Sequence, residues 1–214
     1  MSLRSGHWLF RFMPHFGYDL ALYKGITNLL WRCPTTRLSD NYAEYLSNNH
    51  LEIGVGTGYF LKRTACPDHM ERLTLLDLSL NCLERSARRL YPLRPSTVQQ
   101  NILEPFPAAL TGYRSVGMNY VLHCLPGNVQ QQTDIFKKVY ATLGNGGVFF
   151  GATLVPADKY RSLLARILMW GLQKTRIFHN QTHTFENLRH ALSATFPKVR
   201  IEQIGHAVVF AAWK

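Results

Sequence analysis

Acidic residues, cysteines and long apolar runs are all scarce in this sequence. Its 214 residues include 13 Asp and Glu against 24 Lys and Arg, which gives a formal net charge of +11. Such a surplus indicates nucleic acid, an anionic membrane surface or an anionic small molecule as a partner. Because only 17% of the residues are charged and 46% are hydrophobic, a disordered basic tail is excluded, and one globular domain with a buried core is expected.

The cysteines and the apolar runs exclude further classes of protein. Cys33, Cys66, Cys82 and Cys124 are widely spaced and contain no Cys-x-x-Cys pair, so we expect neither a disulfide framework nor a zinc site. Reduced thiols are typical of the cytoplasm, where we place the protein. No apolar run approaches the roughly 18 residues of a membrane span, and arginines interrupt the aromatic N-terminus, which signal peptides do not show.

Strand-like and helix-like patterns alternate from residue 50 onward. Apolar runs predict strands over 50–54, 73–77, 96–101, 115–119, 147–153, 198–204 and 207–213. Helical patterns predict helices over 57–65, 79–90 and 128–142. Alternation of this kind favours a doubly wound parallel sheet. The last two strands are joined only by the turn around Gly205-His206, so they must pair as an antiparallel hairpin.

Two helix-like segments surround these strands. Residues 1–49 are rich in aromatics and are interrupted at Pro14 and Pro34, so we expect an N-terminal helical cap segment there. Residues 50–214 form the expected ligand-binding core, with a helical lid insertion at about 155–184. Within it, residues 158–176 combine helically spaced apolar side chains with five Lys and Arg. A lid lying on the sheet is favoured over a basic helix that contacts an anionic membrane or a carrier protein.

A glycine-rich turn follows the first predicted strand. Gly54, Gly56 and Gly58 alternate with other residues, which lets the backbone turn tightly and lets a ligand lie close to it. The sequence contains no P-loop, and Tyr59 stands where the dinucleotide fingerprint requires a small residue. We therefore expect a ligand without a pyrophosphate, and a plain tight turn is the alternative.

The next two strands end in polar residues that suit a nucleoside. Asp77 ends the second strand, 19 residues after Gly58, where a carboxylate can accept both hydroxyls of a ribose. Its alternative role is to cap the helix that begins near Ser79. The third strand ends at Gln99-Gln100-Asn101, where a side-chain amide could meet the edge of an adenine.

Taken together, these motifs resemble the class I S-adenosylmethionine-dependent methyltransferases, and in particular their small stand-alone members that tailor natural products. The resemblance implies an α/β fold, a Rossmann-like doubly wound seven-stranded sheet with its last strand antiparallel, plus a helical cap. It also implies S-adenosylmethionine as cofactor and S-adenosylhomocysteine as product. The residues that match the family's cofactor-binding positions are Glu52, Gly54, Gly56, Gly58, Asp77, Leu78, Asn101, Ile102 and Asn119.

The loop after the fourth strand is expected to face the methyl acceptor. It holds Asn119, Tyr120 and His123, and no acidic residue lies between Glu104 and Asp134. The two glutamates of arginine methyltransferases and the Pro-Pro motif of enzymes that methylate base amino groups are absent from this loop. A neutral or anionic small molecule is therefore favoured as acceptor. His123 is the candidate general base, and a loop histidine bonded to the backbone is the alternative.

Four aromatic residues are candidates for binding the acceptor: Tyr18, Tyr23, Trp31 and Tyr120. For Tyr18, Tyr23 and Trp31, packing between the cap helices is an equally good explanation. His179 and His183 have helical spacing but no carboxylate or cysteine partner nearby, so no metal is expected. The predicted activity is methyl transfer to oxygen, or to nitrogen, of a small secondary metabolite. A nucleic-acid methyltransferase and a metabolite cyclase or rearrangement enzyme are the alternatives, and nucleic acid is the less favoured partner. The oligomeric state stays open.

Overall fold

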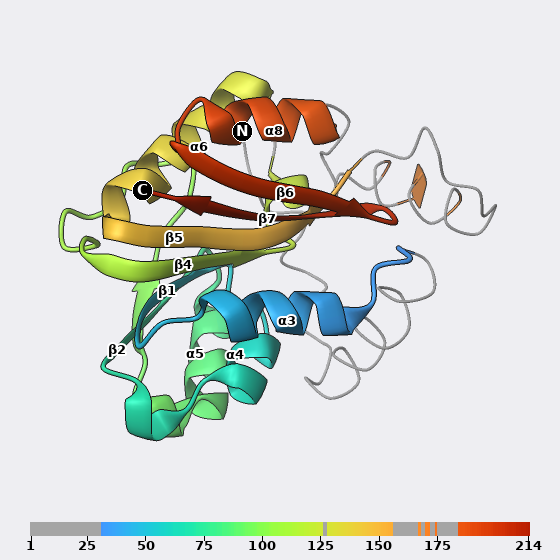
Figure 1. Ribbon diagram of the computed structural model, residues 1–214. Coiled ribbons are helices and arrows are strands. Elements are labelled where there is room, and N and C mark those ends of the chain that lie inside the picture. The colour runs from blue at the N-terminus through green and yellow to red at the C-terminus, as the bar shows by residue number, and fades with distance from the viewer. Residues whose placement is uncertain (1–30, 126–127, 156–166, 168–169, 172–173, 175–183) are drawn as a thin grey trace.

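Seven strands in a single sheet organise the molecule. The computed structural model describes residues 31–125, 128–155, 167, 170, 171, 174 and 184–214 (Figure 1). The strands are β1 Asn49–Ile53, β2 Arg72–Asp77, β3 Ser96–Gln99, β4 Tyr113–Asn119, β5 Leu143–Leu154, β6 Lys198–Ile204 and β7 Ala207–Trp213. The α-helices bounded within the described residues are α3 Thr35–Tyr45, α4 Tyr59–Thr64, α5 Leu80–Arg89, α6 Val129–Thr142 and α8 Phe185–Ser193. Short 3-10 helices are η2 Pro67–His69, η3 Tyr91–Leu93 and η4 Leu122–Cys124.

The strand order is β3-β2-β1-β4-β5-β7-β6. Strands β1 to β5 pair in parallel, whereas β7 runs antiparallel to both β5 and β6. The predicted doubly wound sheet with an antiparallel last strand is therefore confirmed. The order reverses between β1 and β4, and in open sheets of this kind ligands bind beyond the carboxyl ends of the strands at such a reversal.

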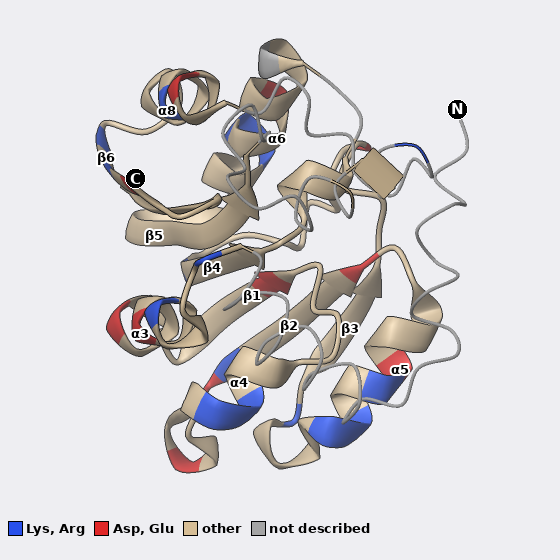
Figure 2. Ribbon diagram, turned by 90° about the vertical axis from the view of Figure 1, so that its right-hand side faces the viewer, with Lys and Arg blue, Asp and Glu red and all other residues tan. Residues whose placement is uncertain are grey.

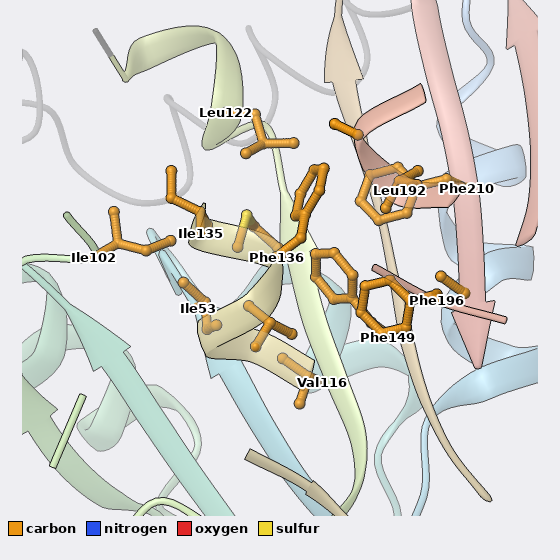
Figure 3. Close-up of a cluster of buried hydrophobic side chains, with 14 of the residues drawn as sticks. Ile53, Ile102, Val116, Leu122, Ile135, Phe136, Phe149, Leu192, Phe196 and Phe210 are labelled. Carbon is orange, nitrogen blue, oxygen red and sulfur yellow. The ribbon is translucent and has the colours of Figure 1, made fainter. Parts of the chain in front are cut away.

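Helices cover both faces of the sheet (Figure 1). Helices α3, α4 and α5 lie on one face, and α6 and α8 lie on the other. Alternation along β5 supplies both layers, because Phe149 packs toward α6 and α8 while Phe150 packs toward α3. Figure 3 shows the first of these clusters, in which the Phe149 ring lies 5.0 Å from Phe210 and 5.8 Å from Phe196 between ring centroids. Burial on both faces explains why β2 and β5 read as nearly continuous apolar runs.

Several element ends differ from the sequence-based prediction by one to four residues, and at three of them local backbone structure gives the reason. Helix α4 begins at Tyr59 rather than at 57, because Gly58 adopts a left-handed φ of 68° that a helix does not contain. Strand β3 ends at Gln99 rather than at 101, because Asn101 turns the chain. Strand β5 begins at Leu143 rather than at 147, through a bulge at which the β4 ladder shifts register.

Part of the predicted cap segment packs on the sheet. Helix α3 begins directly after Pro34 and is held against β6 by ion pairs Arg37–Glu202 at 2.8 Å and Arg200–Glu44 at 3.1 Å. Residues 1–30 and most of the predicted lid lie outside the described residues, so the cap and lid stay predictions.

Figure 2 shows Lys and Arg on α4 and α5. No helix in the described part of the chain is long and apolar enough to cross a membrane.

Candidate active site

A cleft lies at the carboxyl ends of β1 and β4. Residues from α3, β1, the glycine-rich turn, α4 and the end of β4 surround it. They are Tyr42, Glu52, Gly54, Val55, Gly56, Thr57, Gly58, Tyr59, Phe60, Leu61, Asn119 and Tyr120. The structure thus brings together six of the predicted cofactor-binding and substrate-binding positions.

The glycine-rich turn depends on glycine for two different reasons. Gly54, Gly56 and Gly58 all have positive φ, between 53° and 70°, which residues with a Cβ rarely adopt. A Cβ at Gly54 would also lie 2.2 Å from Cγ2 of Val121, so the turn packs directly against the chain that follows β4. A Cβ at Gly56 would meet nothing closer than a carbonyl oxygen at 4.0 Å. Gly56 therefore leaves its side of the cleft open to a ligand.

Glu52 brings a buried carboxylate to the cleft and is only 4% exposed. Its Oε1 accepts a hydrogen bond from the Tyr42 hydroxyl at 2.6 Å, and its Oε2 lies 2.9 Å from Nε2 of His50. Asp77, the other charged residue of the predicted cofactor site, does not line the cleft, and Glu52 is the single charged residue among the described side chains that do. A buried carboxylate of this kind suits a cationic ligand group.

Asp77 lies beside the glycine-rich turn at the end of β2. Its Oδ2 accepts from the Gly56 amide at 3.5 Å, and its Oδ1 accepts from the Ser79 amide at 2.9 Å. Ser79 itself caps α5, because its hydroxyl accepts from the Cys82 amide. Burial, and then the Asp77 charge, raise the pKa of the Cys82 thiol to about 11. Leu78 follows at the strand end, where its carbonyl accepts from Gln99.

Asn101 and Ile102 form the loop after β3 and do not line the cleft. Asn101 Oδ1 accepts from the Leu103 amide at 3.0 Å, and its Nδ2 donates to Glu104 Oε1 at 3.3 Å, so the side chain shapes its own turn. Ile102 is buried in the core, and Figure 3 shows it near Ile53 and Ile135. Lys138 of α6 donates to the carbonyl oxygen of Ile102, and burial lowers the pKa of this lysine. The adenine role of Asn101 and Ile102 stays a prediction.

The end of β4 carries an unsatisfied amide and a strained residue. Asn119 lines the cleft, and both its Oδ1 and its Nδ2 are buried without a hydrogen-bond partner among the described residues. Tyr120 has φ of +56°, an uncommon conformation for a residue with a Cβ, held by its amide donating to Ala152 at 2.8 Å. Two thiols flank Tyr120, and burial raises the pKa of Cys33 to about 11 and of Cys124 to about 12. Within the described part of the chain, this side of the cleft carries no charge at neutral pH.

His123 is 3% exposed and faces β5 rather than the cleft lining. Its Nδ1 accepts the Leu154 amide at 3.3 Å and lies 3.3 Å from Oγ1 of Thr153. Because an accepting Nδ1 carries no hydrogen, the neutral ring keeps its hydrogen on Nε2. In this tautomer the lone pair that could take a proton is on Nδ1, and it already accepts the hydrogen of the Leu154 amide. The backbone contact is the one that the alternative interpretation expected, and the role of general base stays a prediction.

The remaining sequence candidates are less central. Trp31 is 2% exposed, packs in the core beneath α3 and accepts from the His206 amide through its carbonyl oxygen. Tyr18 and Tyr23 lie outside the described residues, as do His179 and His183. Across the described ranges, no three His, Cys, Asp or Glu side chains gather to hold a metal ion.

Tyr42 and His50, which are hydrogen-bonded to the Glu52 carboxylate, were not among the site residues predicted from the sequence. His50 was open to detection, because side chains at i and i+2 of a strand point to the same face. Tyr42 carried no such signal, since its contact with Glu52 depends on how α3 docks on the sheet.

Known proteins show the same combination of sequence and fold. The chain is 39% identical over 196 residues to the demethylluteothin O-methyltransferase of Streptomyces thioluteus, covering 92% of this chain and 85% of that protein. It is 33% identical over 184 residues to the N-methyltransferase vrtF of Penicillium aethiopicum, covering 85% and 76%. The N-methyltransferase NodS of Bradyrhizobium japonicum WM9, solved with S-adenosyl-L-homocysteine, superposes with a TM-score of 0.58 at 18% identity, over 97% of this chain and 91% of that one.

No protein-family model matches the chain. The level of identity to the curated methyltransferases over nearly the whole chain is nevertheless sufficient, and the sheet order and the glycine-rich turn agree with it. This chain belongs to the class I S-adenosylmethionine-dependent methyltransferases.

Proposed function

We propose that this enzyme transfers the methyl group of S-adenosylmethionine to an oxygen atom of a small, neutral or anionic secondary metabolite. One observation carries the choice of acceptor: among the described residues, the β4 side of the cleft has no charge with which to hold a cation. No acidic residue occurs between Glu104 and Asp134, and the thiols flanking Tyr120 keep their protons at neutral pH. The relative with 39% identity, named a demethylluteothin O-methyltransferase, supports oxygen as the target.

The cleft fits the cofactor on the properties of its own residues. Gly56 leaves open space beside the turn, and Glu52 offers a buried carboxylate to a cationic group. The orphaned amide of Asn119 offers both a donor and an acceptor. Asp77, held beside Gly56, is our candidate for the ribose hydroxyls, and Leu78, Asn101 and Ile102 for the adenine. The cofactor supplies an electrophilic methyl group, and these side chains bind and orient it.

Methyl transfer from a sulfonium is an in-line displacement, in which alignment and exclusion of water supply much of the rate. Tyr120 and the aromatic residues Tyr18, Tyr23 and Trp31 are our candidates for orienting the acceptor. His123 is our candidate base for a hydroxyl acceptor. It can accept a proton only if its Nδ1 is released from the Leu154 amide, whether Nδ1 then takes the proton itself or takes the hydrogen of Nε2 and leaves Nε2 to accept. We therefore assign alignment the larger share of the catalysis.

Nitrogen is the second candidate for the methylated atom. The observation that favours it is the relative named an N-methyltransferase, at 33% identity over 85% of this chain. A neutral amine or amide nitrogen would suit the uncharged β4 side as well as an oxygen does. Nucleic acid and a membrane surface are not favoured as partners, because the basic residues are spread along the chain and form no single dense run. The four free cysteines support a reducing compartment, and we propose the cytoplasm.

A labelling experiment tests the proposal. The protein is incubated with methyl-labelled S-adenosylmethionine and a metabolite extract from a strain that lacks it, and products are analysed by mass spectrometry. We expect one small metabolite to gain the label and the mass of one methylene group, together with S-adenosylhomocysteine. Fragmentation then separates O-methyl from N-methyl products. Label in RNA or DNA, or a product of unchanged mass, would contradict the proposal.

A further inference from the structure

Among the described residues that line the cleft, Glu52 is the one with a charged side chain, and it is almost completely removed from water. A buried carboxylate without donors would lose its solvation and would be free to rotate away. In this structure both oxygens are hydrogen-bonded, so the direction of the carboxylate is fixed.

Hydrogen bonds connect Glu52 to the far end of the sheet. Tyr42 donates its hydroxyl to Oε1 at 2.6 Å, and Nε2 of His50 donates to Oε2 at 2.9 Å, since a carboxylate only accepts. Nδ1 of His50 lies 2.8 Å from Oγ of Ser115 on β4, and that hydroxyl lies 2.8 Å from Oγ of Ser47. The chain of contacts thus runs from the cleft, across β1 and β4, to the loop before β1.

The sheet is shaped to admit this arrangement. His50 and Glu52 stand two residues apart on β1, so both side chains project from the same face. Gly117 of β4 pairs with Glu52 in the ladder. A Cβ at Gly117 would lie 2.5 Å from Oε2 of Glu52 and 3.1 Å from Cε1 of His50. Only a residue without a side chain leaves room for the pair at this point.

We propose that Tyr42 and His50 are positioning residues for the cofactor, which hold the Glu52 carboxylate toward the ammonium group that S-adenosylmethionine and S-adenosylhomocysteine share. The inference rests on the proposed function of the cleft. It makes α3 part of the cofactor site, although no residue of this helix belongs to the glycine-rich motif. Neither Tyr42 nor His50 needs to touch the reacting atoms, because each acts through Glu52.

The ring of Tyr42 can be separated from its hydroxyl. The ring stacks on Phe60 with centroids 5.0 Å apart and meets Phe150 edge-on at 5.1 Å, contacts that phenylalanine keeps. Tyr45, one turn further along α3, is a matched control. It also packs on Phe150, but its hydroxyl accepts from Arg200 and does not line the cleft.

The test compares Tyr42→Phe with Tyr45→Phe in the full chain. Binding of S-adenosylhomocysteine is measured by calorimetry, and thermal unfolding is measured without ligand. We expect Tyr42→Phe to bind about tenfold more weakly, because a hydrogen bond to a charged group is lost, and Tyr45→Phe to bind like the parent. If Tyr42→Phe lowers only the unfolding temperature and leaves the dissociation constant unchanged, the inference is overturned.

A second pair of variants tests His50, should Tyr42→Phe not fold. His50→Leu removes the donor to Glu52, and His50→Gln keeps an amide donor near the same place. We expect weakened binding of S-adenosylhomocysteine in the first and partial rescue in the second. Equal binding by both variants and the parent would rule out a positioning role. Failure of the proposed acceptor chemistry would instead show as absent methylated product, with these dissociation constants unaffected.

Discussion

Strands β1 and β4 lie side by side and each sends one polar side chain to the cleft, yet the two side chains differ in every physical respect. Glu52 on β1 is charged, and both its oxygens are bonded by neighbouring side chains. Asn119 on β4 is neutral, and among the described residues nothing bonds either its Oδ1 or its Nδ2. Among the described residues, the Glu52 carboxylate therefore has its hydrogen-bond partners within the protein, whereas the Asn119 amide has none.

The difference shows how a binding site divides its work. A charge must be prepared before the ligand arrives, because an unsupported buried carboxylate would protonate or turn away. A neutral amide can stay without a hydrogen-bond partner until the ligand binds, since leaving it unpaired costs only about 1–3 kcal/mol. Hydrogen bonds to the bound ligand offset that cost. The β1 side therefore supplies attraction for a cation, and the β4 side supplies hydrogen bonds that form only on binding.

The largest effect is expected when the charge on the β1 side is removed. Glu52→Gln keeps the shape of the side chain but offers no carboxylate to a cationic ligand. Hydrogen bonds and charge contacts of this type contribute about 1.5–3 kcal/mol, so S-adenosylhomocysteine should bind roughly 10- to 150-fold more weakly. The free energy of unfolding should also fall, because Tyr42 and His50 lose a charged acceptor.

Calorimetry and urea unfolding measure these two quantities separately. A matched comparison is Glu44→Gln on α3, where the carboxylate lies on the surface against Arg200 and outside the cleft. Surface pairs contribute about 0–1 kcal/mol, so this control should leave ligand binding unchanged. Strong binding by Glu52→Gln would show that the cleft does not use its charge.

On the β4 side, we expect a variant of Asn119 to weaken ligand binding less than Glu52→Gln does, and not to lower the stability of the free protein. Asn119→Leu replaces the unsatisfied amide by an apolar group of similar shape, so the free protein should be as stable as the parent or up to about 1 kcal/mol more stable. Binding should weaken by about 3- to 10-fold, since neutral hydrogen bonds contribute less than charged ones. The same two measurements check it.

The decisive comparison is the free energy of unfolding, which Glu52→Gln should lower and Asn119→Leu should keep or raise. If Asn119→Leu destabilises the free protein as Glu52→Gln does, then Asn119 has a structural partner and the two strand ends are alike. If it is neutral in both measurements, the amide is not used by the ligand.

Much of this contrast lay beyond the reach of sequence, for a physical reason. The glycines were predictable because tight turns restrict residue type locally: only glycine tolerates the φ of Gly54 beside Val121. Glu52 was assigned only through the resemblance to the methyltransferase family. The doubly wound parallel strands and the terminal hairpin followed from strand-helix alternation and the short β6–β7 connection, which are also local. Whether a polar group is satisfied is not local, and the state of Asn119 could not be read from its neighbours in the chain.

The same limit explains the boundaries and the roles that sequence left uncertain. Two-residue errors at α4 and β3 arose where one residue turns the backbone, as Gly58 and Asn101 do. Tyr42 lies ten residues from Glu52 on a separate helix, so its hydroxyl bond exists only through tertiary packing. His123 was chosen for its chemistry, but the direction of its Nδ1 toward Leu154 is set by the close approach of η4 to β5.

The smallest effect is a loss of stability at alkaline pH. It comes from the Cys33 thiol, which is uncharged at neutral pH on the β4 side. Burial raises the pKa of the Cys33 thiol from 9.0 to about 11, with the Tyr120 contact acting in the opposite direction. The unfolded thiol therefore ionises first as pH rises. Stability from this group is complete below about pH 9 and is lost progressively toward pH 11. The loss should reach about 1 kcal/mol at pH 10.

Urea unfolding of the parent and of Cys33→Ala at pH 7 and pH 10 measures this term. The variant has its own packing cost at both values, but its additional loss at pH 10 should be smaller than that of the parent by about 1 kcal/mol. Equal losses would mean that the thiol ionises in the folded protein as readily as in the unfolded chain. The β4 side would then carry a negative charge at alkaline pH, and the contrast with the β1 side would hold only near neutrality.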